Sequence, residues 1–98
     1  MPEITITDTD QRRATDQVLD VREDFEVAEG MIPGAIHIHM GELNTRLGEI
    51  DRTRPVIVIC RSGNRSARVA DALTGAGFTA DTMAGGMTAW QRAGLPVT

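Results

Sequence analysis

The segment from residue 55 to residue 66 constrains the fold of this chain more than any other. The run Pro55-Val56-Ile57-Val58-Ile59 is apolar throughout, as in a strand that is covered on both faces of a sheet. It ends at Cys60, the one cysteine among 98 residues. A polar stretch with a glycine follows, and then a helical pattern begins. The sequence therefore predicts a cysteine on the turn between a buried strand and a helix.

Other short apolar segments alternate with helical patterns on both sides of this turn. We expect strands at residues 3–7, 17–21, 35–38, 55–59 and 78–83. We expect helices at 41–50 and after the Cys60 loop, and a last helix that Gly85-Gly86 opens and that Gly94 and Pro96 end. This alternation implies right-handed crossovers, and so an α/β fold with a mostly parallel sheet and helices on both faces. Ligands of such sheets bind at the carboxyl ends of the strands, where Cys60 falls.

Apolar spacing predicts which faces of the last two helices are buried. The helix after the Cys60 loop should be about three turns long and should end near Gly75 and Gly77. Its expected apolar stripe comprises Val69, Ala72, Leu73 and Ala76. In the final helix, Met87 and Trp90 are interpreted as core residues.

Length and composition limit the class of protein. A chain of 98 residues with 41% hydrophobic content suits one small core, so we expect a single domain over residues 1–98. The net charge of −4 argues against a nucleic-acid partner. No apolar run approaches the roughly 20 residues of a membrane helix, and no secretory signal is present, so we expect no membrane contact. A single cysteine excludes an internal disulfide and a thiolate-rich metal site; a reducing, cytoplasmic location without a cofactor is the expectation.

All ten cationic residues are arginines, which excludes a lysine base or a Schiff base. Six of them lie between Arg46 and Arg68, so positive charge is concentrated around Cys60 in the sequence and favours a small anionic substrate. The arginines interpreted instead as solvated helix-face residues are Arg12, Arg13, Arg52 and Arg92.

The residues after Cys60 favour a reactive thiolate over the inert, small hydrophobic residue that a strand-end cysteine is by default. Gly63 permits a left-handed backbone, so the amides from Arg61 to Ser66 can turn toward the sulfur. The helix that follows adds its positive end. An ordinary thiol has a pKa of about 8.5 and is mostly protonated at pH 7, whereas these groups would favour its anion.

The side chains of the loop have different expected roles. Arg61 and Arg65 can each hold the oxygens of an anion bidentately. Ser62 and Asn64 either take part in binding or only stabilise the turn. Ser66 is expected to be an N-cap or first-turn residue, and also a hydrogen-bond donor to the sulfur.

Four motifs together resemble the rhodanese-like sulfurtransferases, specifically their single-domain members, over nearly the whole chain. They are Leu19-Asp20-Val21-Arg22, Gly30-Met31-Ile32-Pro33-Gly34-Ala35, Cys60-Arg61-Ser62-Gly63-Asn64-Arg65-Ser66, and Gly85-Gly86-Met87-Thr88-Ala89-Trp90 leading to Gly94-Leu95-Pro96-Val97. The resemblance implies a five-stranded parallel sheet flanked by helices. It also implies that the Cys60 thiolate takes sulfur from a donor such as thiosulfate, releases sulfite, and passes the sulfur from a persulfide to cyanide or a thiol. Asp20 and Arg22 resemble the pair that braces the loop region in the family, or form a strand-end salt bridge without a chemical part.

Two positions depart from the pattern of the family. Met31 stands where the family usually has histidine, and His39 stands where it usually has proline after the third strand. Neither position carries the sulfur chemistry in the family, so the departures concern local loop shape. His37 and His39 are two residues apart and could in principle bind a metal, but no third ligand is evident and no metal site is predicted.

Other functions remain open. Cysteine-dependent phosphatases and arsenate reductases use five residues between cysteine and arginine, whereas four separate Cys60 from Arg65, a shorter loop that fits a persulfide and crowds a phosphate. No aspartate general acid is evident, although candidates lie between Asp8 and Asp24.

Regulatory modules of the family generally lack the loop cysteine. A sulfur carrier that docks a dedicated acceptor protein is a further alternative, and without a second cysteine the sulfur must pass to an external acceptor in either case.

Overall fold

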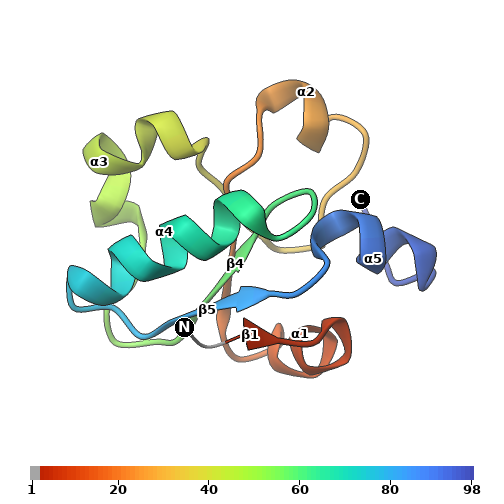
Figure 1. Ribbon diagram of the computed structural model, residues 1–98, viewed down its shortest axis with the longest axis horizontal. Coiled ribbons are helices and arrows are strands. Elements are labelled where there is room, and N and C mark those ends of the chain that lie inside the picture. The colour runs from red at the N-terminus through yellow and green to blue at the C-terminus, as the bar shows by residue number, and fades with distance from the viewer. Residues whose placement is uncertain (1–2) are drawn as a thin grey trace.

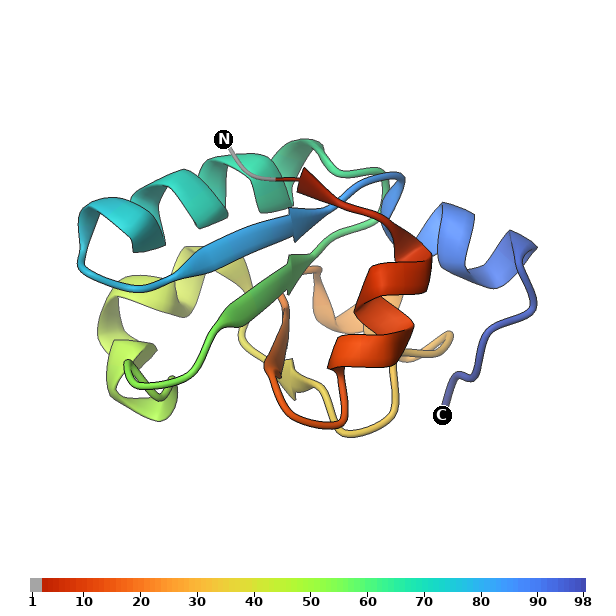
Figure 2. The same cartoon turned by 90° about the horizontal axis from the view of Figure 1, so that it is seen from below.

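The computed structural model describes residues 3–98 and contains a five-stranded sheet with helices on two sides (Figures 1 and 2). The strands are β1 (Glu3–Ile4), β2 (Gln17–Asp20), β3 (Ile36–His37), β4 (Val56–Ile59) and β5 (Ala80–Met83). Their order is β1-β5-β4-β2-β3, and each neighbouring pair is parallel. The predicted α/β class with a parallel sheet is confirmed.

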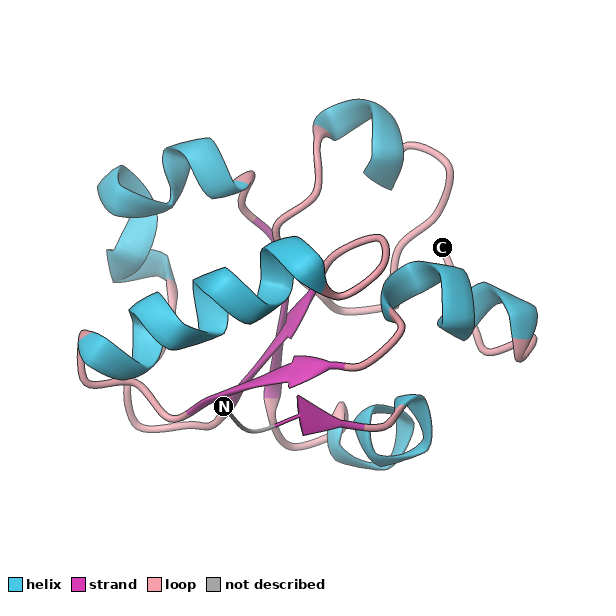
Figure 3. Cartoon of the chain, viewed as in Figure 1, coloured by secondary structure: helices cyan, strands magenta, loops and turns pink. Residues whose placement is uncertain are grey.

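The helices connect these strands. They are α1 (Ile6–Arg12), α2 (Asp24–Val27), α3 (Leu43–Arg46), α4 (Asn64–Gly75) and α5 (Gly86–Arg92), with short 3₁₀ segments at Met40–Glu42 and Leu47–Glu49. None of the helices in the described part of the chain is long and apolar enough to cross a membrane. Figure 3 shows that the helices surround the strands, which carry the loops at their ends.

The central strand β4 has an apolar layer on each face because its side chains alternate. Val56 and Val58 belong to the core cluster that includes residues of α3 and α4. Ile57 and Ile59 belong to a second cluster on the opposite face, which includes residues of α5. Helices therefore cover both faces of the sheet, as the unbroken apolar run predicts.

Met87 and Trp90 lie in this second cluster and are confirmed as core residues, with 1% and 0% of their surface exposed. The indole N–H of Trp90 donates to the carbonyl of Pro96 at 2.8 Å, so the buried ring has no unpaired polar atom. This contact holds the segment after α5 against the end of the helix.

The expected first strand at residues 3–7 is wrong beyond Ile4, because α1 begins at Ile6. Thr5 is the N-cap of α1: its hydroxyl accepts a hydrogen bond from the N–H of Asp8 at 3.0 Å, and the Asp8 carboxylate accepts one from the N–H of Thr5 at 3.4 Å. These reciprocal bonds form a capping box, which stabilises a helix here although Ile and Thr alternate as in a strand. Helix α1 was not predicted.

Two helical predictions need correction in detail. The segment 41–50 is divided into a 3₁₀ turn, the short α3 and a second 3₁₀ turn, although its apolar residues Leu43 and Ile50 are buried. Helix α4 has the predicted length, but Ala72 and Ala76 are exposed. Its buried stripe consists of Ser66, Val69, Ala70 and Leu73.

The carboxyl ends of β2, β4 and β5 lie at one edge of the sheet because the strands are parallel. The loop after β4 lies at this edge, near α2, the start of α4 and the start of α5 (Figures 1 and 3). The N–H of Met87 donates to the carbonyl of Cys60 at 2.9 Å, and that of Thr88 donates to the carbonyl of Arg61 at 3.0 Å. These bonds attach α5 to the loop.

Candidate functional site

Cys60 follows directly after β4, and the loop turns back around its sulfur. The residue is 1% exposed. The Sγ atom accepts a hydrogen bond from the N–H of Gly63 at 3.0 Å and lies 3.3 Å from the Ser66 hydroxyl. Gly63 has φ +106°, so the left-handed backbone expected there is present. It is the N-cap of α4, which leaves Ser66 in the first turn of that helix rather than at the cap.

The Ser66 hydroxyl has three neighbours. Besides the sulfur, it lies 3.1 Å from the carbonyl of Gly63 and 2.6 Å from the hydroxyl of Thr82 on β5. Ser66 has one proton to give, so it can donate either to the carbonyl or to a Cys60 thiolate. In the second arrangement the Thr82 hydroxyl can donate to Ser66 and so keep its oxygen satisfied.

The surroundings of Cys60 act on its acidity in two directions. Burial raises the pKa of the thiol, because the charged form loses its hydration. The Ser66 hydroxyl and the backbone N–H groups of Ser66, Gly63 and Ser62 lower it, and together they outweigh burial. The net pKa of Cys60 is therefore lower than that of an ordinary thiol. The side chains of Ser62 and Asn64 are exposed.

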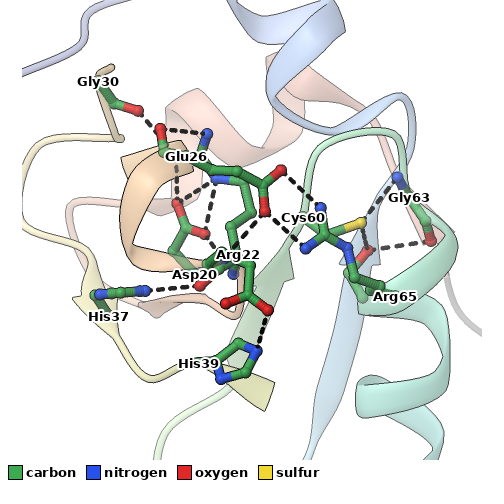
Figure 4. A network of polar contacts seen from close by, with 11 residues as sticks. Asp20, Arg22, Glu26, Gly30, His37, His39, Cys60, Gly63 and Arg65 are labelled. Carbon is green, nitrogen blue, oxygen red and sulfur yellow. Dashed lines mark hydrogen bonds and ion pairs between the residues drawn. The ribbon is translucent and has the colours of Figure 1, made fainter. Parts of the chain in front are cut away.

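Arg65 reaches away from the loop toward α2. Its two terminal nitrogens donate to the two carboxylate oxygens of Glu26 at 2.8 and 2.9 Å, a bidentate pair (Figure 4). Glu26 is buried, and these hydrogen bonds lower its pKa to about 2, against the effect of burial. The guanidinium that was expected to hold a substrate anion is thus held by an internal carboxylate.

Asp20 and Arg22 form a second, fully buried pair at the end of β2. The Arg22 guanidinium donates to both carboxylate oxygens of Asp20, at 2.8 to 3.1 Å. It also donates to the carbonyl of Gly30 at 2.8 Å and to that of Glu26 at 3.4 Å. Arg22 therefore fixes the backbone of α2 and of the turn after it, and Glu26 connects this brace to Arg65 on the loop.

Sequence reasoning missed Glu26 and Thr82. Glu26 is separated from Arg65 by 39 positions, and no local pattern marks such a pair. Thr82 had one usable signal, because it lies in the expected strand 78–83 directly before the apolar Met83, and polar side chains within core strands usually have a hydrogen-bond partner.

The arginines between Arg46 and Arg68 do not gather around Cys60, which corrects the expectation from the sequence. Arg46 pairs with Glu42 and Glu49. Arg52 lies over the ring of Phe78, 4.3 Å from its centroid, and Arg54 donates to the carbonyl of Thr15. Of the six arginines, Arg61 and Arg65 stay in the Cys60 loop, whereas Arg46, Arg52 and Arg54 contact other parts of the chain.

Arg61 takes a different direction from Arg65. It is exposed and lines a cleft of about 440 Å³ between α2 and α5. Arg92 on α5, interpreted from the sequence as a solvated surface residue, lines the same cleft. Cationic side chains from the Cys60 loop and from α5 therefore line one cleft.

The two histidines contact α2 and the residues before it. Nε2 of His37 lies 2.7 Å from the carbonyl of Arg22, and Nε2 of His39 lies 2.7 Å from the carboxylate of Glu23. Within residues 3–98 no three His, Cys, Asp or Glu side chains are grouped as a metal site. Met31 contacts the last residue of the chain through its backbone: the N–H of Thr98 donates to the carbonyl of Met31 at 2.9 Å.

Comparison with known proteins agrees with this geometry. Residues 5–93 match the family model of the rhodanese-like domain. YtwF of Bacillus subtilis is 47% identical over 74 residues, which are 76% of this chain and 72% of that protein. A sulfurtransferase of Allochromatium vinosum is 39% identical over 99 residues, with 97% of this chain and 92% of that protein covered.

A solved structure gives the same result at the level of the fold. The rhodanese-related protein of Thermoplasma volcanium superimposes with a TM-score of 0.95 at 34% identity, over 100% of this chain and 98% of that one. The chain therefore belongs to the rhodanese-like family of sulfurtransferases.

Proposed function

We propose that this protein transfers sulfane sulfur from a small anionic donor such as thiosulfate, through a persulfide on Cys60, to cyanide or a thiol. The observation that carries the proposal is the sulfur of Cys60 inside its loop. Hydrogen bonds from Ser66 and from backbone N–H groups lower the pKa of this thiol even though it is buried. A thiolate at neutral pH is the nucleophile that sulfur transfer requires.

The reaction takes two displacements. The Cys60 thiolate attacks the outer sulfur of thiosulfate, the S–S bond of the donor breaks, and sulfite leaves with the bonding electron pair. An acceptor thiolate or cyanide then attacks the outer sulfur of the persulfide. Cys60 leaves as a thiolate and is ready for the next cycle, so each step conserves atoms and charge. The N–H groups from Arg61 to Ser66 would stabilise negative charge on the sulfur in both steps.

The two loop arginines receive different roles in this proposal. Arg61 is exposed beside the cleft and is the candidate for orienting the oxygens of the donor. Arg65 is bound bidentately to Glu26, so in this arrangement it positions the loop against α2. Asp20 and Arg22 act indirectly as positioning residues, because Arg22, held by Asp20, binds the backbone of α2 and of the turn after it.

The short loop argues against phosphatase chemistry. Four residues separate Cys60 from Arg65, and the guanidinium that would bind a phosphate is paired with Glu26.

A reducing cytoplasm is the proposed setting, because a lone reactive thiol must be kept reduced between cycles.

Steady-state kinetics with thiosulfate and cyanide test the proposal. Wild-type protein should form thiocyanate and sulfite in equal amounts, and Cys60→Ser should form neither. Arg61→Gln should raise the KM for thiosulfate about tenfold with a smaller change in kcat, since a charge-assisted contact to the donor is lost. Arg68→Gln, which removes an exposed charge on α4, is the matched control.

Activity retained in Cys60→Ser would refute the proposal. Hydrolysis of a phosphate ester by the wild type, without thiocyanate formation, would favour the phosphatase alternative. Turnover that is fast with an acceptor protein and slow with cyanide and small thiols would identify the protein as a partner-dependent sulfur carrier.

A further inference from the structure

The cleft between α2 and α5 has walls of opposite charge. Glu26 and Glu29 lie on the α2 side, Arg92 lies on the α5 side, and Arg61 comes from the loop after β4. Its volume of about 440 Å³ is within the roughly 300–1,000 Å³ of small-molecule sites. The cleft adjoins the start of the Cys60 loop, because Arg61 lines it and the N–H groups of Met87 and Thr88 in its wall bond to the backbone carbonyls of Cys60 and Arg61.

The charged residues of this cleft fall into two groups. Arg22 and Glu26 are buried and are paired with Asp20 and Arg65. Arg61, Arg92 and Glu29 are exposed. Among residues 3–98 the structure gives these three side chains neither an ion pair nor a hydrogen bond. The cleft thus presents two free cations and, across from them, one free carboxylate.

We propose that this cleft binds the sulfur acceptor, and that the acceptor is a small thiol carrying both a carboxylate and an ammonium group. Its carboxylate pairs with Arg92 and Arg61, and its ammonium group pairs with Glu29. This assignment rests on the proposed function and deepens it by specifying the acceptor. A cyanide ion has no ammonium group to pair with Glu29, and a thiol without charged groups would leave all three side chains without a partner.

The transfer step balances with such an acceptor. The thiolate of the bound acceptor attacks the outer sulfur of the Cys60 persulfide, a new S–S bond forms, and the bond to Cys60 breaks. The products are the persulfide of the acceptor and the Cys60 thiolate. Arg61 can serve the donor and the acceptor in turn, since donor product leaves before acceptor binds in a two-step displacement. Arg92 and Glu29 are therefore the residues that distinguish the acceptor.

A panel of four thiols tests each charge separately. L-Cysteine carries both groups, 3-mercaptopropionate only the carboxylate, cysteamine only the ammonium group, and 2-mercaptoethanol neither. Arg92→Gln should lower kcat/KM three- to tenfold for the two carboxylate-bearing thiols and leave the other two unchanged. Glu29→Gln should lower it by a similar factor for L-cysteine and cysteamine. Each thiol is compared with itself across variants, so differences in intrinsic reactivity cancel.

The controls are Arg68→Gln and Asp71→Asn, which remove exposed charges of the same signs from α4, away from the cleft. Neither should change the ranking of the four thiols. Equal losses for all four thiols in Arg92→Gln or Glu29→Gln would overturn the proposal, as would no loss for any of them.

A binding measurement separates this proposal from the proposed function. S-Methyl-L-cysteine and 3-(methylthio)propionate cannot accept sulfur through a free thiol, and their binding is followed by the amide NMR shifts of residues 86–92. S-Methyl-L-cysteine should shift these amides, and its affinity should fall three- to tenfold in both variants. The propionate should lose affinity only in Arg92→Gln. If Cys60 takes no sulfur from thiosulfate, the proposed function is wrong, and these titrations still show whether the cleft binds the amino-acid groups. If no amide shifts in the wild type, the cleft does not bind them and the proposed site is wrong.

Discussion

The Ser66 hydroxyl connects the sulfur of Cys60 to the interior of the sheet. Its oxygen lies 3.3 Å from Sγ of Cys60 and 2.6 Å from the hydroxyl of Thr82. A proton donated by Thr82 leaves Ser66 free to give its own proton to a thiolate. The protonation of the nucleophile therefore depends on a side chain in the first turn of α4 and on one in β5.

Ser66→Ala tests this dependence. The substitution removes a hydrogen bond that lowers the pKa of Cys60, so the pKa should rise and less thiolate should be present at neutral pH. Alkylation by iodoacetamide at pH 7 should slow about tenfold, and its pH profile should move to higher pH. Ser62→Ala should leave the profile in place, because Ser62 acts through its N–H. An unchanged profile in Ser66→Ala would show that the backbone alone sets the acidity.

Individual residues of the site could be predicted from the sequence where the contact is local. Cys60, Gly63 and Ser66 lie within seven positions, and glycine at the turn has the predicted positive φ. The partner of Arg65 could not be found in this way. The position of Arg65 in the loop of a cysteine predicts an anion-binding group, and only the folded chain brings Glu26 to 2.8 Å from it.

Helix α2 is a short element held by contacts outside itself. It has four residues, too few for a stable helix alone. Arg22 binds the carbonyl of Glu26, and the side chain of Glu26 binds Arg65 at the start of α4. The position of α2, and so one wall of the cleft, depends on these buried pairs.

The stability of the protein should depend on the ionisation of Glu26. Its pKa of about 2 lies below the ordinary value of 4.5, because Arg65 favours the charged form. The stabilisation is complete above pH 4.5 and is lost as the pH falls toward 2, a change of roughly 3 kcal/mol. Urea unfolding of wild type and Glu26→Gln at pH 7, 4 and 3 measures it.

The difference in unfolding free energy between these two proteins should shrink as the pH falls, since the wild type then loses what the variant already lacks. Glu29→Gln removes an exposed carboxylate near the same helix and should unfold in parallel with the wild type. A constant difference between wild type and Glu26→Gln at all three pH values would contradict the pairing with Arg65.

Helix α5 begins in close contact with the Cys60 loop, and this contact requires a glycine. Gly86 has φ +57°, and a Cβ there would overlap the carbonyls of Cys60 and Arg61. Gly86→Ala should therefore reduce the free energy of unfolding by about 3 kcal/mol or more. Gly94→Ala is the matched control: φ is +71° but no atom lies within 4 Å, so about 1 kcal/mol is expected. If both variants lost the same free energy of unfolding, measured with heat or urea, the positive φ and not the close contact with the two carbonyls would account for the loss at Gly86.

Elements were predictable where burial is periodic and less so where capping decides. The apolar run of β4 and the stripe of α4 identify a central strand and a helix, although Ala70 rather than Ala72 faces the core. Helix α1 escaped prediction because Ile4 and Ile6 alternate with threonines like a strand, while the Thr5–Asp8 capping box starts a helix.

Across the whole molecule, the parallel sheet collects distant segments at one edge. The residues that surround Cys60 come from the end of β2, from α2, from β5 and from α5, and Figure 4 shows part of this network reaching from His37 to Arg65. Because every strand points the same way, their carboxyl ends meet there. The fold class could be predicted from alternating patterns alone, whereas the charges gathered at this edge depend on the loops.

The intact mass of the reduced protein after brief incubation with thiosulfate shows whether a persulfide forms on Cys60. We predict a gain of about 32 Da, one sulfur atom, which cyanide or a thiol removes and which Cys60→Ser does not show. No gain in mass, with the thiol still open to alkylation, would show that Cys60 takes no sulfur from thiosulfate.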